Sequence, residues 1–279
     1  MARTLFITGV STGLGRALAE AALAAGHTVV GTVRKEIDAE AFRALKPGAA
    51  IPKILDVTDT ARIAPVVAEA EQETGGIDAL VNNAGYGHEG ILEEASMDDV
   101  RHQFEVNVFG AVAMMKAVLP YMRGRRAGRI LNITSMGGII TLPGLSLYHG
   151  TKFALEGISE SVGKEVKDLG IHVTAVEPGG FRTDWAGRSM VRVERSIPDY
   201  DAVFEPVRAR RLAYSGKQIG DPARGAAAML RLLEADNPPY HLLLGSDAVR
   251  MVGEKLDALK SEFAAWEALS LSTDFAEAE

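Results

Sequence analysis

The sequence TLFITGVSTGLG, residues 4–15, predicts a β-strand that runs directly into a glycine-rich loop. An Ala/Leu-rich stretch at helical spacing follows this loop and ends at Gly26. Gly9, Gly13 and Gly15 would let the chain turn tightly and bring backbone N–H groups and a helix N-terminus close to a pyrophosphate. The stretch therefore predicts a strand, loop and helix that together bind a nucleotide.

The rest of the chain alternates short apolar segments with amphipathic ones. The apolar segments predict further strands at residues 28–33, 53–57, 77–83, 128–135, 171–178 and 240–245. Helical spacing predicts helices at residues 39–46, 60–74, 96–123, 146–169, 223–235 and 247–269. This alternation predicts an α/β fold, a single-domain Rossmann-type doubly wound parallel sheet of about seven strands with helices on both faces. We expect one domain over residues 1–279, because α/β folds of this length are commonly one domain.

The composition excludes several classes of protein. The net charge is −7 and the basic residues are scattered, which argues against a nucleic-acid partner. The sequence has no cysteine, which rules out disulfides and thiolate metal sites. No spacing such as H-E-x-x-H occurs, so we expect no metal. The N-terminal apolar run is too short for a signal peptide or a membrane span, and we expect a soluble, cytoplasmic protein with no membrane partner.

A second informative stretch is NITSMGGIITLPGLSLYHGTK, residues 132–152. If residues 146–169 are helical, Tyr148 and Lys152 lie one turn apart on the same face, and the cation would lower the pKa of the phenol. Ser135 would hydrogen-bond a substrate oxygen. His149 points in another direction from Tyr148, so a structural or outer-pocket role is expected for it. A pair on a surface helix would give the same local pattern, so the rest of the chain has to decide.

Chemically informative residues follow several predicted strands at the point where each strand ends. The carboxyl ends of parallel strands meet at one edge of a sheet, and ligands bind beyond that edge. We therefore expect the following residues to surround one site: the glycine loop, Asp56, residues 82–85, Ser135 and residues 178–183.

The residue at the end of the second predicted strand indicates which of the two nicotinamide cofactors binds. An acidic residue there would bind the ribose 2′-hydroxyl of NAD, whereas an arginine accommodates the 2′-phosphate of NADP. Arg34 stands at this point, no acid occurs before Glu36, and Thr32 would add a hydroxyl. The sequence favours NADP(H), with NAD(H) as the alternative. The alternative interpretation is that Arg34 is an exposed arginine that binds no ligand.

Six motifs occur in one order: TGVSTGLG, NNAG at 82–85, Asn107, Ser135, YHGTK at 148–152 and EPGGFRT at 177–183. In this order and spacing the chain resembles the classical short-chain dehydrogenase/reductase family from residue 4 to about residue 245. The resemblance implies an NADP(H)-dependent oxidoreductase, a ketoreductase that interconverts a ketone or aldehyde and its alcohol by hydride transfer. The alternative is a non-catalytic NADP(H)-binding sensor or regulatory protein, which need not keep the full set of motifs.

The resemblance also assigns roles by position. It implies that Tyr148 is the general acid and base, that Lys152 tunes it and holds the nicotinamide ribose, that Ser135 polarises the substrate oxygen, and that Asn107 holds a water of a proton relay. The cofactor contacts that it implies, besides Tyr148 and Lys152, are Gly9, Ser11, Thr12, Gly13, Leu14, Gly15, Arg34, Asp56, Val57, Asn83, Ala84, Gly85, Pro178, Gly179 and Thr183.

Two positions depart from the family pattern. Relatives that prefer NADP often carry a basic residue where this chain has Thr12, which weakens the preference suggested by Arg34 alone. Some relatives carry a bulkier side chain in place of Gly180, and the sequence does not say what this changes.

Residues 184–218 follow the sixth predicted strand without a clean period, which suits a substrate lid. Their large apolar side chains, with residues 138–145, would line a site for a hydrophobic or mixed small molecule, although a packed loop explains them equally well. The residues expected in this lining are Trp185, Met190, Ile197, Tyr200, Phe204 and His88. The resemblance further implies a homodimer or homotetramer, with residues 246–279 as a C-terminal helical extension.

Overall fold

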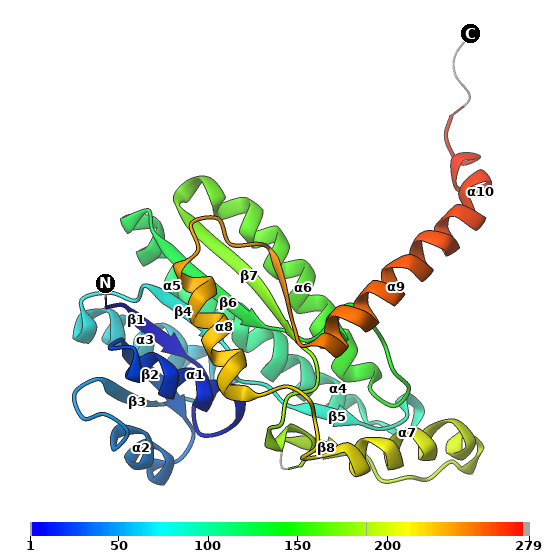
Figure 1. Cartoon of the computed structure of the whole chain (residues 1–279), viewed down its shortest axis with the longest axis horizontal. Helices are drawn as coiled ribbons and strands as arrows, with labels where there is room; N and C mark the ends of the chain where they lie inside the picture. The colour runs from blue at the N-terminus through cyan, green and yellow to red at the C-terminus, as the bar shows by residue number, and fades with distance from the viewer. Residues whose placement is uncertain (1, 188, 276–279) are drawn as a thin grey trace.

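The computed structural model describes residues 2–187 and 189–275. A seven-stranded parallel sheet lies at the centre in the order β3-β2-β1-β4-β6-β7-β9, with helices on both faces (Figure 1). Its strands are β1 Thr4–Ile7, β2 Thr28–Val33, β3 Ala50–Ile54, β4 Ala79–Asn82, β6 Gly128–Ile133, β7 Ile171–Pro178 and β9 His241–Leu244. A separate two-stranded sheet pairs β5 Gly87–Glu89 with β8 Met190–Arg192. The predicted doubly wound Rossmann-type sheet is confirmed.

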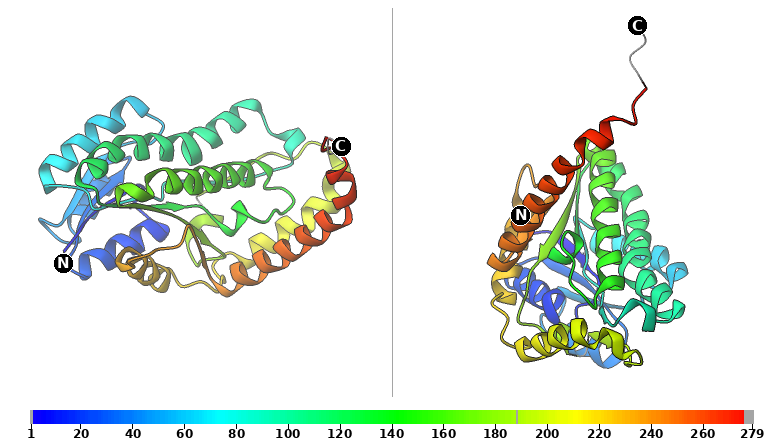
Figure 2. Two further views of the ribbon diagram at one scale, coloured as in Figure 1. Left: turned by 90° about the horizontal axis from the view of Figure 1, so that it is seen from above. Right: turned by 90° about the vertical axis from the view of Figure 1, so that its right-hand side faces the viewer.

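Helices cover both faces of the central sheet, as Figure 2 shows from two further directions. Apolar residues of α1 and α8 pack on one face, and those of α3, α5 and α6 pack on the other. The α-helices are α1 Gly13–Ala24, α2 Glu36–Arg43, α3 Thr60–Thr74, α4 Met97–Phe104, α5 Gly110–Arg125, α6 Ser146–Val166, α7 Asp201–Tyr214, α8 Pro222–Glu234, α9 Ser246–Ala265 and α10 Glu267–Leu271. None of the helices in the described residues has the length and apolar character needed to cross a membrane.

The third strand lies three residues earlier than predicted. Pairing with β2 joins Val29 to Ala50 and Val33 to Ile54, so the strand includes Pro52. Proline cannot donate a ladder hydrogen bond, and it is tolerated here because β3 is the edge strand of the sheet. The helix after β2 likewise begins at Glu36 instead of residue 39.

The long helix predicted at residues 96–123 is interrupted. Ser96 caps its first part, α4, with a capping box that includes Asp99. A π-helical turn, Glu105–Phe109, then separates α4 from α5 and contains Asn107. Such turns insert an extra residue into the hydrogen-bond ladder and often occur at functional sites.

Residues 184–218 are more regular than expected, because they contain β8 and α7. Residue 188 of this segment and residues 276–279 of the predicted C-terminal extension lie outside the described residues. Beyond β9, α9 leaves the body of the molecule and α10 continues it (Figures 1 and 2).

Candidate active site

Ser135, Tyr148 and Lys152 meet at the carboxyl end of β6. Ser135 follows β6 by two residues, and its Oγ accepts a hydrogen bond of 2.9 Å from the backbone N–H of Gly137. Tyr148 and Lys152 lie one turn apart near the start of α6, and the Lys152 Nζ is 5.7 Å from the centroid of the Tyr148 ring. The Nζ donates a 2.9 Å hydrogen bond to the carbonyl of Ile133, the last residue of β6. Strand and helix thus bring the predicted hydroxyl, phenol and ammonium together.

Burial controls the protonation of this group. Burial raises the pKa of Tyr148 to about 12, and a hydrogen bond with Ser135 opposes the rise. Burial also lowers the pKa of Lys152 to about 8, opposed by the Glu156 carboxylate. The net direction for Tyr148 is opposite to the lowering expected from Lys152, because Lys152 binds the carbonyl of Ile133 while apolar side chains cover the phenol. The phenol is therefore protonated at neutral pH.

His149 supports the loop that carries Ser135. Its Nε2 accepts a 2.9 Å hydrogen bond from the backbone N–H of Leu142, so the proton lies on Nδ1, 2.7 Å from the carbonyl of Gly137. The ring is buried, and burial lowers its pKa. These bonds support the structural role expected for His149.

The Asn107 side chain is buried, and it makes three hydrogen bonds to the protein. Its Oδ1 accepts from the Tyr86 N–H at 3.0 Å, and its Nδ2 donates to the Tyr86 carbonyl at 3.0 Å and to Thr151 Oγ1 at 3.1 Å. Thr151 lies beside Lys152 on α6, so Asn107 joins the π-helical turn to the helix that carries Tyr148. Both amide hydrogens of Asn107 are used in these bonds, so the side chain would meet a relay water only as an acceptor, through Oδ1.

The glycine loop fits a bound pyrophosphate. Gly9 and Gly13 have positive φ angles of 74° and 65°, and a Cβ on Gly13 would meet no atom within 4 Å, so open space lies beside it. A Cβ on Gly15 would lie 2.3 Å from Asn83 Nδ2 and 2.4 Å from the Gly9 carbonyl oxygen. The Thr12 side chain makes no capping hydrogen bond at the start of α1, which leaves the helix N-terminus available to an anion.

Asn83 and Thr32 fix the glycine loop by hydrogen bonds to its backbone. The Asn83 Nδ2 donates to the carbonyls of Thr8 and Gly9, both at 2.9 Å, and Thr8 Oγ1 accepts from the N–H groups of Asn83 and Ala84. The Thr32 Oγ1 accepts from the Gly9 N–H at 3.0 Å. Thr32 is buried, so the hydroxyl expected to bind the 2′-phosphate supports the loop instead.

Arg34 and Asp56 lie beyond the ends of β2 and β3. Both side chains are exposed at the same edge as the glycine loop, and Arg34 is one of the charges that lower the pKa of Asp56. Asp56 Oδ1 also accepts from the N–H and hydroxyl of Thr58, at 3.0 and 2.8 Å. Val57 is buried against Gly110. Of the remaining predicted contacts, Ser11 is exposed, Leu14 packs on the core, and Gly85 lies beside Asn107 and Lys152.

The segment after β7 depends on Asp247, which the sequence did not identify as a site residue. Asp247 Oδ2 accepts a 2.7 Å hydrogen bond from the Gly180 N–H, and a Cβ on Gly179 would lie 2.2 Å from Asp247 Oδ1. Pro178 ends β7, and its carbonyl lies 3.5 Å from Ser135 Oγ. Thr183 Oγ1 accepts from the Trp185 N–H at 3.4 Å. The only sequence signal for Asp247 is its place just after the last strand.

Apolar side chains from the segment after β7 cover Tyr148. The Trp185 ring lies 5.2 Å from the Tyr148 ring, and Met190, Leu142 and Leu145 pack around them. The other side chains predicted to line the site are not part of this apolar cluster around Tyr148. His88 is buried on β5, Phe204 is buried against Gly144, and the Tyr200 hydroxyl donates to Glu93 at 2.6 Å.

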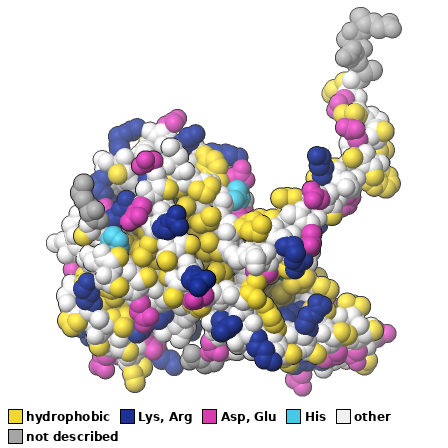
Figure 3. All heavy atoms as spheres, in the orientation of Figure 1, with side chains coloured by type: hydrophobic (Ala, Val, Ile, Leu, Met, Phe, Trp, Pro, Cys, Tyr) yellow, Lys and Arg dark blue, Asp and Glu magenta, His cyan; other side chains and the backbone are white. Residues whose placement is uncertain are grey.

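Ion pairs hold this covering segment to the loops near β5. Arg195 pairs with Glu94, whose oxygens also accept from the N–H groups of Ser196 and Ile197, each at 2.7 Å. Arg211 on α7 donates to Glu89 at 2.8 Å. Figure 3 shows Lys and Arg side chains gathered over the part of the surface where α7 lies.

Comparison with known proteins identifies relatives of this chain. The sequence profile of the family described as short chain dehydrogenase matches residues 3–191. Oxidoreductase BOA17 of Botryotinia fuckeliana is 39% identical over 274 residues, covering 98% of this chain and 100% of that protein. The 3-ketodihydrosphingosine reductase of Bacteroides thetaiotaomicron is 35% identical over 243 residues, covering 86% of this chain and 87% of that protein.

Two solved structures are similar to the structure of this chain. A crystal structure of a short-chain dehydrogenase from Streptomyces avermitilis has a TM-score of 0.91 and 42% identity, covering 99% of this chain and 100% of that one. The structure of ElxO with NADP bound has a TM-score of 0.72 and 26% identity, covering 87% of this chain and 96% of that one.

Proposed function

We propose that this chain, which belongs to the short-chain dehydrogenase family of oxidoreductases, uses NADP(H) to interconvert a ketone or aldehyde and the corresponding alcohol. The observation that carries this proposal is the meeting of Ser135, Tyr148 and Lys152 beside the glycine loop, at one edge of the sheet. The Ser135 hydroxyl lies close enough to lower the pKa of Tyr148, so both hydroxyl groups would be able to approach one substrate oxygen.

The cofactor would lie across the carboxyl ends of β1, β2, β4 and β7. Backbone groups of residues 9–15 would hold the pyrophosphate, because the loop has an uncapped helix N-terminus and open space at Gly13. Arg34 would pair with the 2′-phosphate, and Asp56 would lie near the adenine. When bound, NADPH supplies the hydride. NADP bound to the related ElxO and the position of Arg34 both support NADP(H) over NAD(H).

Tyr148 would give its phenol proton to the substrate oxygen during reduction. Burial keeps the phenol protonated at neutral pH but makes it a weak acid, so the Lys152 ammonium would have to favour the phenolate as charge grows on that oxygen. The Ser135 hydroxyl would donate a second hydrogen bond to the same oxygen. Two donors fixed in advance stabilise the transition state more than the ground state. Lys152 would stabilise the phenolate left on Tyr148 and hold the ribose hydroxyls of the cofactor.

Asn107 would act through its main chain. Its side chain is occupied by Tyr86 and Thr151, and the π-helical turn changes the regular pairing of backbone carbonyls. A water bound to the backbone of this turn would return the proton to Tyr148 by way of Lys152.

The substrate would enter under residues 184–218, which we propose act as a lid. Trp185, Met190, Leu142 and Leu145 around Tyr148 favour an apolar or mixed molecule. The 3-ketodihydrosphingosine reductase among the relatives also carries the name of a ketone substrate. We further propose one domain, with residues 246–279 as its C-terminal extension.

A panel of ketones, aldehydes and alcohols tests this function. Purified protein is mixed with each compound and with NADPH or NADP, and the nicotinamide absorbance is followed. We expect turnover of apolar ketones with NADPH. Tight cofactor binding without turnover of any compound would favour a non-catalytic sensor, and a higher kcat/KM with NADH would contradict the cofactor preference.

A further inference from the structure

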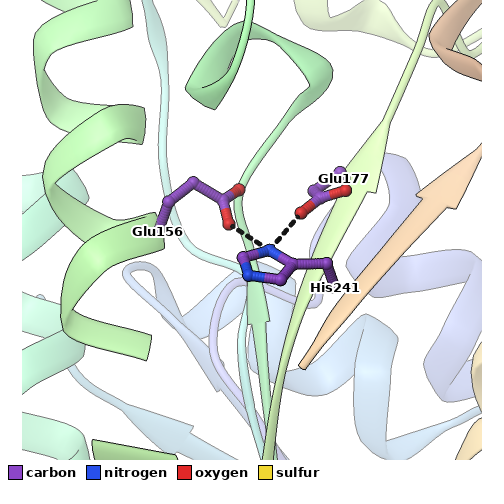
Figure 4. A group of neighbouring side chains, drawn as sticks. All are labelled: Glu156, Glu177 and His241. Atoms are coloured by element: carbon purple, nitrogen blue, oxygen red, sulfur yellow. Dashed lines mark hydrogen bonds and ion pairs between the residues drawn. The ribbon is translucent and has the colours of Figure 1, made fainter. Parts of the chain in front are cut away.

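Glu156, Glu177 and His241 form a cluster that the proposed hydride transfer does not use (Figure 4). They come from α6, β7 and β9, and one ligand atom from each lies within 4.8 Å of the other two. His241 Nδ1 is 2.8 Å from Glu177 Oε1 and 3.3 Å from Glu156 Oε2. Figure 4 shows both carboxylates directed at the imidazole.

The carboxylates of Glu156 and Glu177 are buried, and most of their oxygens lack a hydrogen-bond partner among the described residues. Glu177 is 0% exposed and Glu156 is 7% exposed. Both oxygens of Glu156 and the Oε2 of Glu177 make no hydrogen bond among the described residues. The nearby Thr134 hydroxyl donates to the Val176 carbonyl at 2.9 Å. Burial raises the pKa of Glu156 to about 7, and the neighbouring Glu177 charge adds to the rise. Two adjacent buried carboxyl groups are stabilised by positive charge placed between them.

We propose that Glu156, Glu177 and His241 bind a divalent transition metal ion. Bonds of roughly 2.0–2.2 Å to nitrogen and oxygen place neighbouring ligand atoms about 3 Å apart, which agrees with the distances of 2.8 and 3.3 Å from His241 Nδ1 to the two carboxylates. Imidazole with carboxylates suits Zn²⁺, Mn²⁺ or Fe²⁺. The Glu160 Oε2 lies 3.7 Å from His241 Nε2, where it orients the ring and leaves Nδ1 for the metal.

The site is open to solvent on one side, because the His241 side chain is 43% exposed. An ion can enter there and keep a coordination position for water. Glu156 lies one turn after Lys152, so the ion joins α6 to β7 and β9 behind the reaction centre. Binding that joins three elements stabilises the folded chain.

Zinc uptake tests the site. Full-length protein is treated with a chelator, dialysed and titrated with ZnCl₂, and bound metal and melting temperature are measured. We expect about one Zn²⁺ per chain, a rise in melting temperature, and a Kd at least about tenfold weaker in Glu177→Gln and His241→Ala. His172→Ala, a change in a half-buried histidine at the other end of β7, is the matched control and should bind zinc as the unaltered protein does.

Two outcomes overturn this proposal. One is the absence of stoichiometric zinc uptake by the unaltered protein. The other is uptake that is equal in the unaltered protein and in His241→Ala. Glu177 is in the core, so Glu177→Gln can fail to fold; the partly exposed His241 then decides the result. Neither outcome depends on oxidoreductase activity.

The projecting helix α9 carries a row of apolar side chains, several of which are exposed. Val249, Leu256, Leu259, Phe263 and Trp266 follow one another at spacings of three, four or seven residues along α9 and its end, which is the spacing of a coiled-coil seam. Leu256, Phe263 and Trp266 are 54%, 67% and 63% exposed. Figure 3 shows apolar side chains along this projecting arm.

The charged residues beside these apolar side chains of α9 indicate which surface they pack against. In a parallel pair of α9 helices, Lys255 would face Lys260 and Glu262 would face Glu267, so both contacts would repel. In an antiparallel pair, Lys255 faces Glu262 of the second copy, and the opposite contact repeats by symmetry. We infer that α9 pairs with α9 of a second copy of this chain in an antiparallel arrangement.

Mass and cross-linking measurements test the pairing. Light scattering should give at least a twofold lower mass for Phe263→Glu/Trp266→Glu than for Val203→Glu, which changes an exposed apolar residue of α7. The chain has no cysteine, so Lys255→Cys/Glu262→Cys should form a covalent dimer on oxidation, whereas either single change should not. Equal masses, or a monomer that persists after oxidation of the double variant, would exclude this interface.

Discussion

The glycine loop after β1 is held by backbone groups and short side chains, whereas the segment over Tyr148 is held by ion pairs between distant residues. Asn83 and Thr32 bind the loop at two points within the sheet. Arg195 and Arg211 fasten the covering segment to Glu94 and Glu89, about a hundred positions away. The glycine loop is held by hydrogen bonds to the backbone, whereas the covering segment can open only if the largely buried pairs of Arg195 with Glu94 and of Arg211 with Glu89 separate. We expect cofactor binding and substrate binding to respond to different substitutions.

The largest expected effect comes from Tyr148, where the two regions meet. Tyr148→Phe removes the proposed proton donor and keeps the ring that contacts Trp185. We expect kcat to fall by about 100-fold or more. NADPH affinity, measured by fluorescence titration, should stay within a few-fold of the unaltered protein. Turnover near the original rate would refute the general-acid assignment.

Arg34 lies on the cofactor side alone. Arg34→Ala removes the expected partner of the 2′-phosphate, and the loss of a charge-assisted hydrogen bond of about 1.5–3 kcal/mol predicts roughly a tenfold to 100-fold higher KM for NADPH. KM for NADH and for the carbonyl substrate should change little. An equal rise for both cofactors would contradict the role of Arg34.

Gly15 tests how rigid the loop is. In Gly15→Ala the added Cβ meets the Gly9 carbonyl and the Asn83 amide, so the chain has to shift and the free energy of unfolding should fall by about 1–3 kcal/mol. Gly157→Ala on α6 is the control, because its Cβ meets no atom within 4 Å. It should leave stability unchanged or raise it slightly. Denaturant unfolding measures both, and equal stability of the two variants would show that the loop adapts.

The smallest effect is expected at Glu94. Glu94→Gln weakens the pair with Arg195 but keeps an oxygen that accepts from the N–H groups of residues 196 and 197. Because Arg195 keeps its pairs with Asp201 and Glu205, we expect kcat/KM for the carbonyl substrate to change by only about two- to tenfold, with NADPH affinity unchanged. A change confined to the cofactor would show that the two regions are coupled.

Much of the site follows from local sequence patterns. The glycine spacing after an apolar strand indicates a phosphate loop, and the spacing of Tyr148 and Lys152 puts both on one helix face. Most predicted strands and helices agree with the structure because apolar periodicity is a local property. The order of motifs was needed as well, since a tyrosine and a lysine four residues apart also occur on ordinary surface helices.

Tertiary structure decided the rest. Pairing with β2 moved β3 onto Pro52, which only an edge strand accepts. Contacts across more than 60 residues brought Asp247 to Gly180 and His241 to Glu177. Burial of the phenol, which a local sequence pattern does not reveal, raises the pKa of Tyr148 and outweighs the opposing hydrogen bond with Ser135.

Local patterns in the sequence predicted the alternating strands and helices, the glycine loop and the pairing of Tyr148 with Lys152, because each depends on neighbours within about one helical turn or one strand. The order of the motifs and the family resemblance added Ser135 and Asn107. Only the tertiary structure decided which side chains cover Tyr148, which oxygens remain without hydrogen bonds, and which face of α9 is left exposed. Those features depend on residues far apart in the chain, and their spacing follows no local period.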